Sequence, residues 1–98
     1  MVTPTFNPAN CQYGTYPQLG KPTISQGSSN YSVGYLMAVL YCKTGHTNIY
    51  IHPLPGPWYF NATVRQGVID LQNFFGLTVD GICGPQTWGV VDYLALYA

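Results

Sequence analysis

Apolar residues recur at helical spacing in three separate stretches of the chain. A spacing of three and four residues places side chains on one face of an α-helix. The three stripes are Val33, Leu36, Met37 and Leu40; Val64, Val68, Leu71 and Phe75; and Trp88, Val91, Leu94 and Ala95. Because no helix can bury such a stripe by itself, the pattern predicts an all-α fold, a compact three-helix bundle.

Residues that begin and end helices flank the first stretch. Ser28, Ser29 or Asn30 is expected to cap the first helix, because short polar side chains accept hydrogen bonds from the first backbone N–H groups. The helix should run to about Cys42, and Gly45 can end it.

The second and third helices have similar boundary signals. The second is expected to begin near Asn61 and to stop at Gly76, and the third to begin at Pro85. The run Asn61-Ala62-Thr63 also fits the rule for N-glycosylation, but a helix cap is the better interpretation. Gly67, inside the second helix, should cost about 1 kcal/mol relative to alanine unless a neighbour packs closely there.

A long connection, residues 46–59, joins the first two helices and is rich in proline and aromatic residues. Prolines at positions 53, 55 and 57 favour an extended path, and residues 48–51 permit a short extended piece that could pair with the N-terminal arm. Trp58 and Phe60 either take part in function or cover one end of the core. We expect an N-terminal extended arm over residues 1–21 and a helical domain over residues 22–98.

The most distinctive motif runs from Leu71 to Trp88 and reads LQNFFGLTVDGICGPQTW. Two glycines bracket a tight turn, and Asp80 can accept hydrogen bonds from the backbone of that turn. The segment resembles the repeat of the three-helix peptidoglycan-binding domain, a small non-catalytic module of cell-wall hydrolases and phage lysins. A weaker resemblance to the opening of the family pattern lies at Pro22, Ile24, Gly27, Ser28, Val33 and Leu36.

The resemblance implies a shallow groove beside the loop of residues 80–87 that binds the stem peptide or the glycan of bacterial peptidoglycan. The residues expected to contact this ligand are Asp80, Gly81, Gln86, Thr87, Trp58 and Tyr59. A competing interpretation is structural, with Asp80 pinning the turn and Thr87 satisfying donors at the start of the third helix. The chain departs from the family at Met37, where Gln is usual, and it has no D-G-x-x-G loop before the second helix.

Charged residues are scarce in this chain. They make up 6% of the sequence, and three basic side chains balance three acidic ones, whereas about 25% is usual in soluble domains. A nucleic-acid binder would need a basic surface, so we expect no nucleic-acid partner. A near-neutral surface suits a protein docked in an assembly, although nine tyrosines and many polar uncharged residues could supply solubility instead.

The candidate catalytic and metal-binding residues form no recognised pattern. The chain contains no Glu, so the pair of carboxylates usual in glycoside cleavage is not supported. His46 and His52 lack a known ligand spacing, and nothing indicates which cysteine a histidine would activate. We therefore expect a protein that is not an enzyme and that holds no metal or other cofactor.

Three cysteines leave at least one outside any disulfide within the chain. Cys83 takes a position that is usually apolar in the resembled motif, which favours a small buried thiol. A disulfide between Cys11 and Cys42 would tether the arm to the bundle, whereas assembly in a reducing cytoplasm would favour thiols.

No stretch of the sequence suggests membrane insertion or export. The longest apolar run, around residues 36–40, falls far short of the roughly 20 residues needed to span a bilayer. The N-terminus lacks the basic start and apolar run of a secretory signal. We therefore expect no membrane partner, and location on a phage particle or at the cell wall after lysis.

Two functional hypotheses follow for a protein expected to be of phage origin. The first is a non-catalytic module that binds peptidoglycan, carried on a phage particle or released with a lysis system. The second is a structural protein of the virion, a capsid decoration or a minor capsid or tail component, whose partners are virion proteins or copies of itself.

Overall fold

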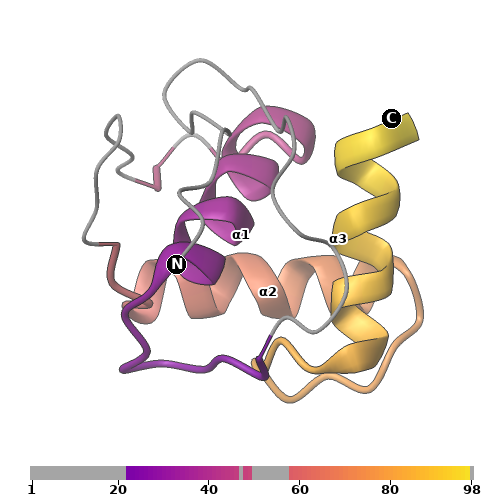
Figure 1. The fold of residues 1–98 in the computed structure, drawn as a ribbon. Coiled ribbons are helices and arrows are strands. Elements are labelled where there is room, and N and C mark those ends of the chain that lie inside the picture. The colour runs from indigo at the N-terminus through magenta and orange to yellow at the C-terminus, as the bar shows by residue number, and fades with distance from the viewer. Residues whose placement is uncertain (1–21, 47, 50–57, 98) are drawn as a thin grey trace.

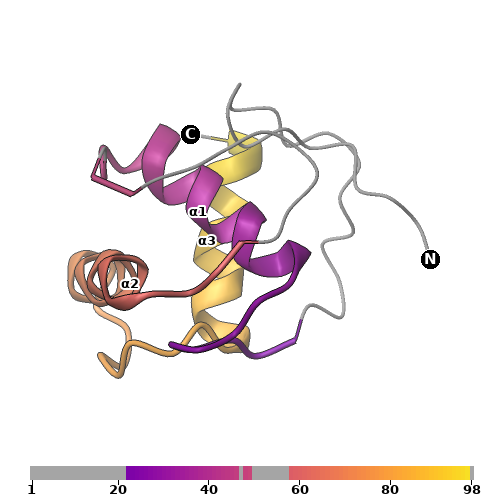
Figure 2. The same ribbon diagram turned by 90° about the vertical axis from the view of Figure 1, so that its left-hand side faces the viewer.

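Three α-helices form the part of the chain that the computed structural model describes, residues 22–46, 48–49 and 58–97. They are α1 (Tyr31–Lys43), α2 (Ala62–Phe74) and α3 (Pro85–Tyr97). Helix α1 packs against both of the others. Helix α2 runs across α1 and α3 (Figure 1). In Figure 2, α2 is seen along its axis, whereas α1 and α3 are seen from the side. The predicted all-α, three-helix fold is confirmed.

Two predicted features fall wholly or largely outside the described residues. The N-terminal arm, residues 1–21, is one of them, and the proline-rich part of the connection, residues 50–57, is the other. Of the short extended piece predicted at residues 48–51, only Asn48 and Ile49 are described, so that piece stays a prediction. Ile49 is buried, and its N–H donates to the His46 carbonyl at 3.2 Å.

Asparagine side chains cap the first two helices. The Oδ1 atom of Asn30 accepts from the Val33 N–H at 3.1 Å, and Oδ1 of Asn61 accepts from the Val64 N–H at 3.0 Å. Each contact satisfies one of the backbone donors that the first turn of a helix leaves without a partner. Asn30 is therefore the cap among the three predicted candidates, and the capping interpretation of Asn61 is confirmed.

Helix α2 ends in a glycine turn that changes the direction of the chain. Gly76 has a φ of +69°, and the Leu77 N–H donates back to the Gln72 carbonyl at 2.9 Å. This is the pattern of a Schellman cap, in which glycine takes the left-handed position without strain. Phe75 lies after the last helical residue, so the helical spacing no longer sets its direction. The prediction that Phe75 faces inward is wrong, since 38% of its surface is exposed.

Short backbone pairings join the segment before α1 to the starts of α2 and α3. Ile24 and Cys83 exchange backbone hydrogen bonds of 3.1 and 2.8 Å, and a second isolated bridge pairs Ser29 with Tyr59. No strand forms in the described part of the chain. Cys83, which pairs with Ile24, is buried and carries a thiol as predicted. The short segment before α1 thus packs with the helices.

Helix α1 is the central element of the core. Every residue from Ser32 to Leu40 is buried, so the helix is covered on all sides rather than on the single predicted stripe. Gly34 makes this possible on one side, because the Trp58 ring lies directly over it. A Cβ atom at Gly34 would lie 2.5 Å from two ring carbons of Trp58. Trp58 is only 1% exposed and also contacts the ring of Tyr31, with centroids 5.5 Å apart.

Aromatic and polar contacts join α1 to α3 on another side. The rings of Tyr35 and Trp88 stack with centroids 6.1 Å apart, and the buried Tyr35 hydroxyl donates to Asp92 Oδ1 at 3.2 Å. Trp88 Nε1–H donates to the Pro22 carbonyl at 2.9 Å. Both polar tips therefore have partners, as buried Tyr and Trp require. The inward positions predicted for α3 at Trp88, Val91 and Leu94 are confirmed.

Cys42, in the last turn of α1, is disulfide-bonded. Cys11 lies outside the described residues, and its predicted pairing with Cys42 stays a prediction. Among the described helices, none combines the length and the hydrophobicity needed to cross a bilayer.

The Gly34→Ala substitution is expected to lower the free energy of unfolding by about 1–3 kcal/mol, because the added methyl group overlaps the Trp58 ring. Urea unfolding followed by circular dichroism measures the change. Gly89→Ala in α3 is the matched control, since its methyl group would meet nothing within 4 Å. That variant should gain about 0.5–1 kcal/mol. Equal stability of Gly34→Ala and the wild type would contradict the close contact with Trp58.

Candidate functional site

The amide of Gln72 organises the loop between α2 and α3 from inside the protein. Gln72 is only 1% exposed. Its Oε1 atom accepts from the backbone N–H groups of Asp80 and Gly81, at 3.1 and 3.0 Å. Its Nε2 group faces three acceptors, each at 3.0 Å: Asp80 Oδ1, the Ile82 carbonyl and Thr87 Oγ1. One side chain of α2 thus fixes both the loop and the first turn of α3.

The loop itself is shaped by Asp80 and Gly81. Asp80 Oδ1 also accepts from the Ile82 N–H at 2.9 Å, which closes a local turn around Gly81. Gly81 has a φ of +73°, and a Cβ atom there would lie 2.9 Å from Nε of Arg65. Glycine is therefore favoured at this position by its backbone angle, and the exposed Arg65 side chain lies over it.

A hollow of about 240 Å³ lies beside this loop, where the sequence predicts a groove. Its lining residues are Gln72, Thr78, Asp80, Ile82, Gly84, Pro85, Gln86 and Thr87. Gln86 is exposed at the start of α3, and its Oε1 atom accepts from the Thr78 N–H at 3.3 Å. We call this hollow the loop groove.

The structure brings only part of the predicted site together. Asp80, Gln86 and Thr87 line the loop groove, and the buried Gly81 lies within the same loop. Trp58 lies in the core over Gly34, in agreement with the alternative that it covers the core, so its ring is not open to a ligand. Tyr59 is 55% exposed but lines neither this hollow nor the one described below.

The hydrogen bonds that Asp80 and Thr87 make in the groove are those expected of residues with a structural role. The Ile82 N–H, and after it the Gln72 amide, hold the pKa of Asp80 below its ordinary value. Thr87 is buried and pairs with Gln72. Both residues therefore maintain the shape of the groove, and ligand contact by Asp80, Gln86 or Thr87 stays a prediction.

A second, larger hollow lies where α1 and α2 end. It measures about 330 Å³ and is lined by Lys43, Thr44, His46, Asp70, Leu71, Phe74, Phe75 and Leu94. We call it the helix-end pocket. None of its residues was among the predicted contacts. The Phe74-Phe75 pair before the Gly76 stop was the one sequence signal, because two adjacent aromatics at a helix end cannot both face the core.

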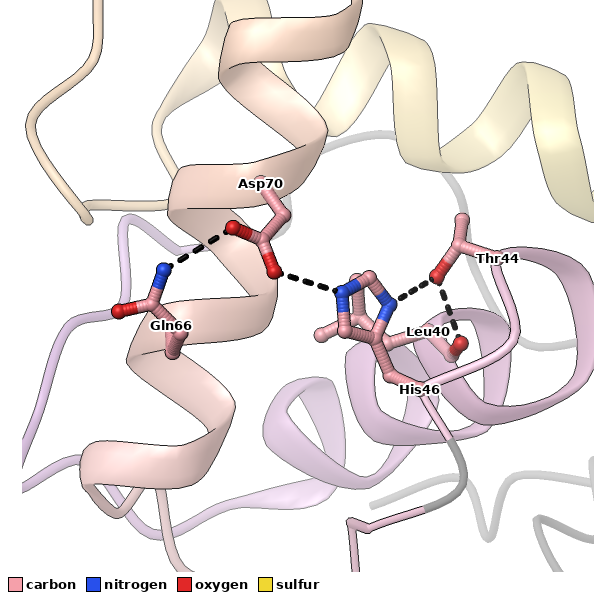
Figure 3. Close-up of polar contacts among 5 residues, drawn as sticks. All are labelled: Leu40, Thr44, His46, Gln66 and Asp70. Carbon is pink, nitrogen blue, oxygen red and sulfur yellow. Dashed lines mark hydrogen bonds and ion pairs between the residues drawn. The ribbon is translucent and has the colours of Figure 1, made fainter.

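A chain of polar contacts crosses one side of the helix-end pocket (Figure 3). Thr44 Oγ1 donates to the Leu40 carbonyl at 2.6 Å and lies 2.5 Å from His46 Nδ1. His46 Nε2 lies 3.0 Å from Asp70 Oδ2, and Gln66 Nε2 donates to Asp70 Oδ1 at 2.9 Å. The hydrogen bond from Gln66, and then the one from His46, hold the pKa of Asp70 below its ordinary value.

His46 links the segment after α1 to α2 through its two ring nitrogens. Thr44 Oγ1, which donates to the Leu40 carbonyl, lies next to Nδ1. Nε2 faces the Asp70 carboxylate, which can only accept, so Nε2 is the donor in this contact.

The histidines and acidic residues of the described part are spread apart or engaged with other side chains. Within the described ranges, no three His, Cys, Asp or Glu side chains gather closely enough to hold an ion. His46 is engaged by Thr44 and Asp70, and His52 lies outside the described residues.

Comparison with known proteins finds a family resemblance over the segment that forms the loop groove. Residues 51–91 match the family model described as "Putative peptidoglycan binding domain". The match covers α2, the Gln72-bound loop and the first half of α3, and it confirms the resemblance predicted from the motif at residues 71–88. No curated protein and no solved structure matches the chain.

Replacing Gln72 by alanine is expected to lower the free energy of unfolding by about 2–4 kcal/mol. The substitution leaves the Asp80 and Gly81 N–H groups and the buried Thr87 hydroxyl without this partner. Urea unfolding measures stability, and amide hydrogen exchange should show faster exchange at Asp80 and Gly81. Gln66→Ala, an exposed glutamine of the same helix, is the control and should change stability by about 0.5 kcal/mol or less. Equal effects of the two substitutions would contradict the role of Gln72.

The Asp80 carboxylate should make stability dependent on acid pH. Because folding lowers its pKa, its contribution is present above the ordinary value of about 4 and is lost as the pH falls through the folded value. Asp80→Asn should therefore be less stable than the wild type at pH 7, and the difference in stability should narrow as the pH falls below about 4. Thermal unfolding at a series of pH values measures this gap. A gap that stays constant with pH would show that the charge of Asp80 is not involved.

Proposed function

We propose that this chain, which resembles the peptidoglycan-binding family over residues 51–91, is a non-catalytic module that binds peptidoglycan. The family match is the observation that carries the proposal. It spans the whole loop groove, since all the lining residues lie between positions 72 and 87. The loop groove is therefore the surface on which the family function is expected to depend.

The geometry of the loop groove supports binding. Five contacts of the Gln72 amide hold the loop in one conformation before any ligand arrives. A preformed surface loses less conformational entropy on binding than a loop that must become ordered. The exposed Gln86 presents an amide at the rim, a group suited to the hydroxyl and amide groups of a wall polymer.

The same groove is poorly suited to cleaving that polymer. Hydrolysis of a glycosidic bond usually requires two carboxyl groups on either side of the bond. Asp80 is the one carboxylate among the residues that line the groove, and its Oδ1 is occupied by Gln72 and the Ile82 N–H. These observations support a module that binds the wall without cutting it.

A structural role in a phage virion is the second candidate function. Its support is the combination of a charge-poor chain with several exposed aromatic rings, of Tyr59, Phe74 and Tyr93. Such surfaces suit contacts with other proteins. The two roles are compatible on a particle that displays a wall-binding module, and the proposed location is then the virion, or the cell wall after lysis.

Co-sedimentation with purified peptidoglycan sacculi tests the first function. The wild-type protein is expected to sediment with sacculi at micromolar concentration and not with cellulose. Gln86→Ala should weaken binding by about two- to tenfold, the effect of one lost hydrogen bond. Gln26→Ala, an exposed glutamine that does not line the loop groove, is the control and should bind as the wild type does.

Failure of the wild type to sediment would contradict wall binding. Detection of the protein in purified phage particles, at a fixed number of copies per particle, would then favour the structural role.

A further inference from the structure

We propose that the helix-end pocket is a second binding site, which takes the peptide stem of peptidoglycan rather than its glycan. The inference rests on the proposed function. It specifies which part of the polymer binds outside the loop groove. Stem peptides carry small apolar side chains together with free carboxylate and ammonium groups, whereas the glycan presents mainly hydroxyl and amide groups.

The floor of the pocket is apolar and partly open to solvent. Leu71 and Leu94 are buried at its base. Phe74 is 83% exposed, and its ring meets that of Phe75 edge to face at 5.1 Å. Most of the Phe74 ring is therefore open to contact with another molecule beside the buried Leu71 and Leu94.

Charged and ionisable groups line this pocket beside its apolar side chains. They are Lys43, Asp70 and His46. Both signs of charge are therefore close to an apolar surface. This combination suits a short peptide with carboxylate, ammonium and methyl groups.

The arrangement of the rim is fixed by close packing of α1 on α2. A Cβ atom at Gly67 would lie 3.0 Å from Leu40 Cδ1 and 3.7 Å from a ring carbon of His46. This close approach brings the His46 ring to Asp70, one turn further along α2, where the pair is held at 3.0 Å. The pocket is thus formed before a ligand binds, as the loop groove is.

The pocket also depends on residues beyond the matched family segment. Lys43, Thr44, His46 and Leu94 lie outside residues 51–91, whereas Asp70, Leu71, Phe74 and Phe75 lie inside. Half of the pocket is therefore supplied by parts of this chain that the family match does not cover.

Nuclear magnetic resonance titration with two soluble probes tests the assignment. One probe is a synthetic stem tetrapeptide of alanine, glutamate, a diamino acid and D-alanine, and the other is the neutral sugar chitotetraose. The tetrapeptide is expected to shift the backbone signals of residues 43–46 and 70–75, and chitotetraose is expected to leave them unchanged. Phe74→Ala should weaken tetrapeptide binding by about two- to tenfold. Asp70→Asn, with its fold checked by thermal unfolding, should weaken it as well.

Val79→Ala is the matched control, an exposed apolar residue outside the pocket, and should bind the tetrapeptide as the wild type does. Unchanged pocket signals with the tetrapeptide, or equal affinity of Phe74→Ala and the wild type, would overturn the inference. A dimer in solution that Phe74→Ala converts to a monomer, without tetrapeptide binding, would assign the pocket to a second copy and also overturn it. If the wild type sediments with sacculi while the tetrapeptide does not bind, the proposed function stands and only this site is lost.

Discussion

The buried amide of Gln72 is the contact on which the loop between α2 and α3 depends. A glutamine inside a core is costly unless every donor and acceptor finds a partner. Here the partners come from the loop backbone, from Asp80 and from Thr87 in α3. The same contacts that satisfy the buried amide also set the path of the loop. Stability of the core and shape of the loop groove are therefore two results of one side chain.

Two glycines inside helices, which have no side chain, set how closely neighbouring parts of the fold approach. Gly34 lets the Trp58 ring lie directly on α1, and Gly67 lets α2 approach Leu40. The first contact covers the core at the end of the long connection, and the second brings His46 to Asp70. In the interior of a helix, glycine lowers helix propensity by about 1 kcal/mol. Its presence at both positions is explained by what packs against it rather than by the backbone, and the helix-end pocket is a consequence of that packing.

The sequence predicts the helices well because their signals are local. Helical spacing, the caps at Asn30 and Asn61 and the stop at Gly76 each depend on residues that are only a few positions apart in the sequence. Phe75 is predicted wrongly because the apolar stripe continues one residue beyond the end of the helix. The helix-end pocket could not be predicted, since His46 and Asp70 are 24 residues apart and meet only through the packing at Gly67. Gln72 is part of the motif at residues 71–88, but its hydrogen-bond partners depend on the path of the folded loop.

The two hollows differ in chemistry in a way that follows from where the charges lie. In the loop groove the single lining carboxylate, Asp80, accepts hydrogen bonds from its own loop, so the surface offers amide and hydroxyl groups beside the apolar Ile82 and Pro85. In the helix-end pocket a lysine, a histidine and an aspartate surround apolar side chains. Peptidoglycan consists of sugar strands that carry charged stem peptides as branches. Under the two proposals, each surface contacts one part of that polymer, and two weak contacts on one molecule add to a stronger attachment than either gives separately.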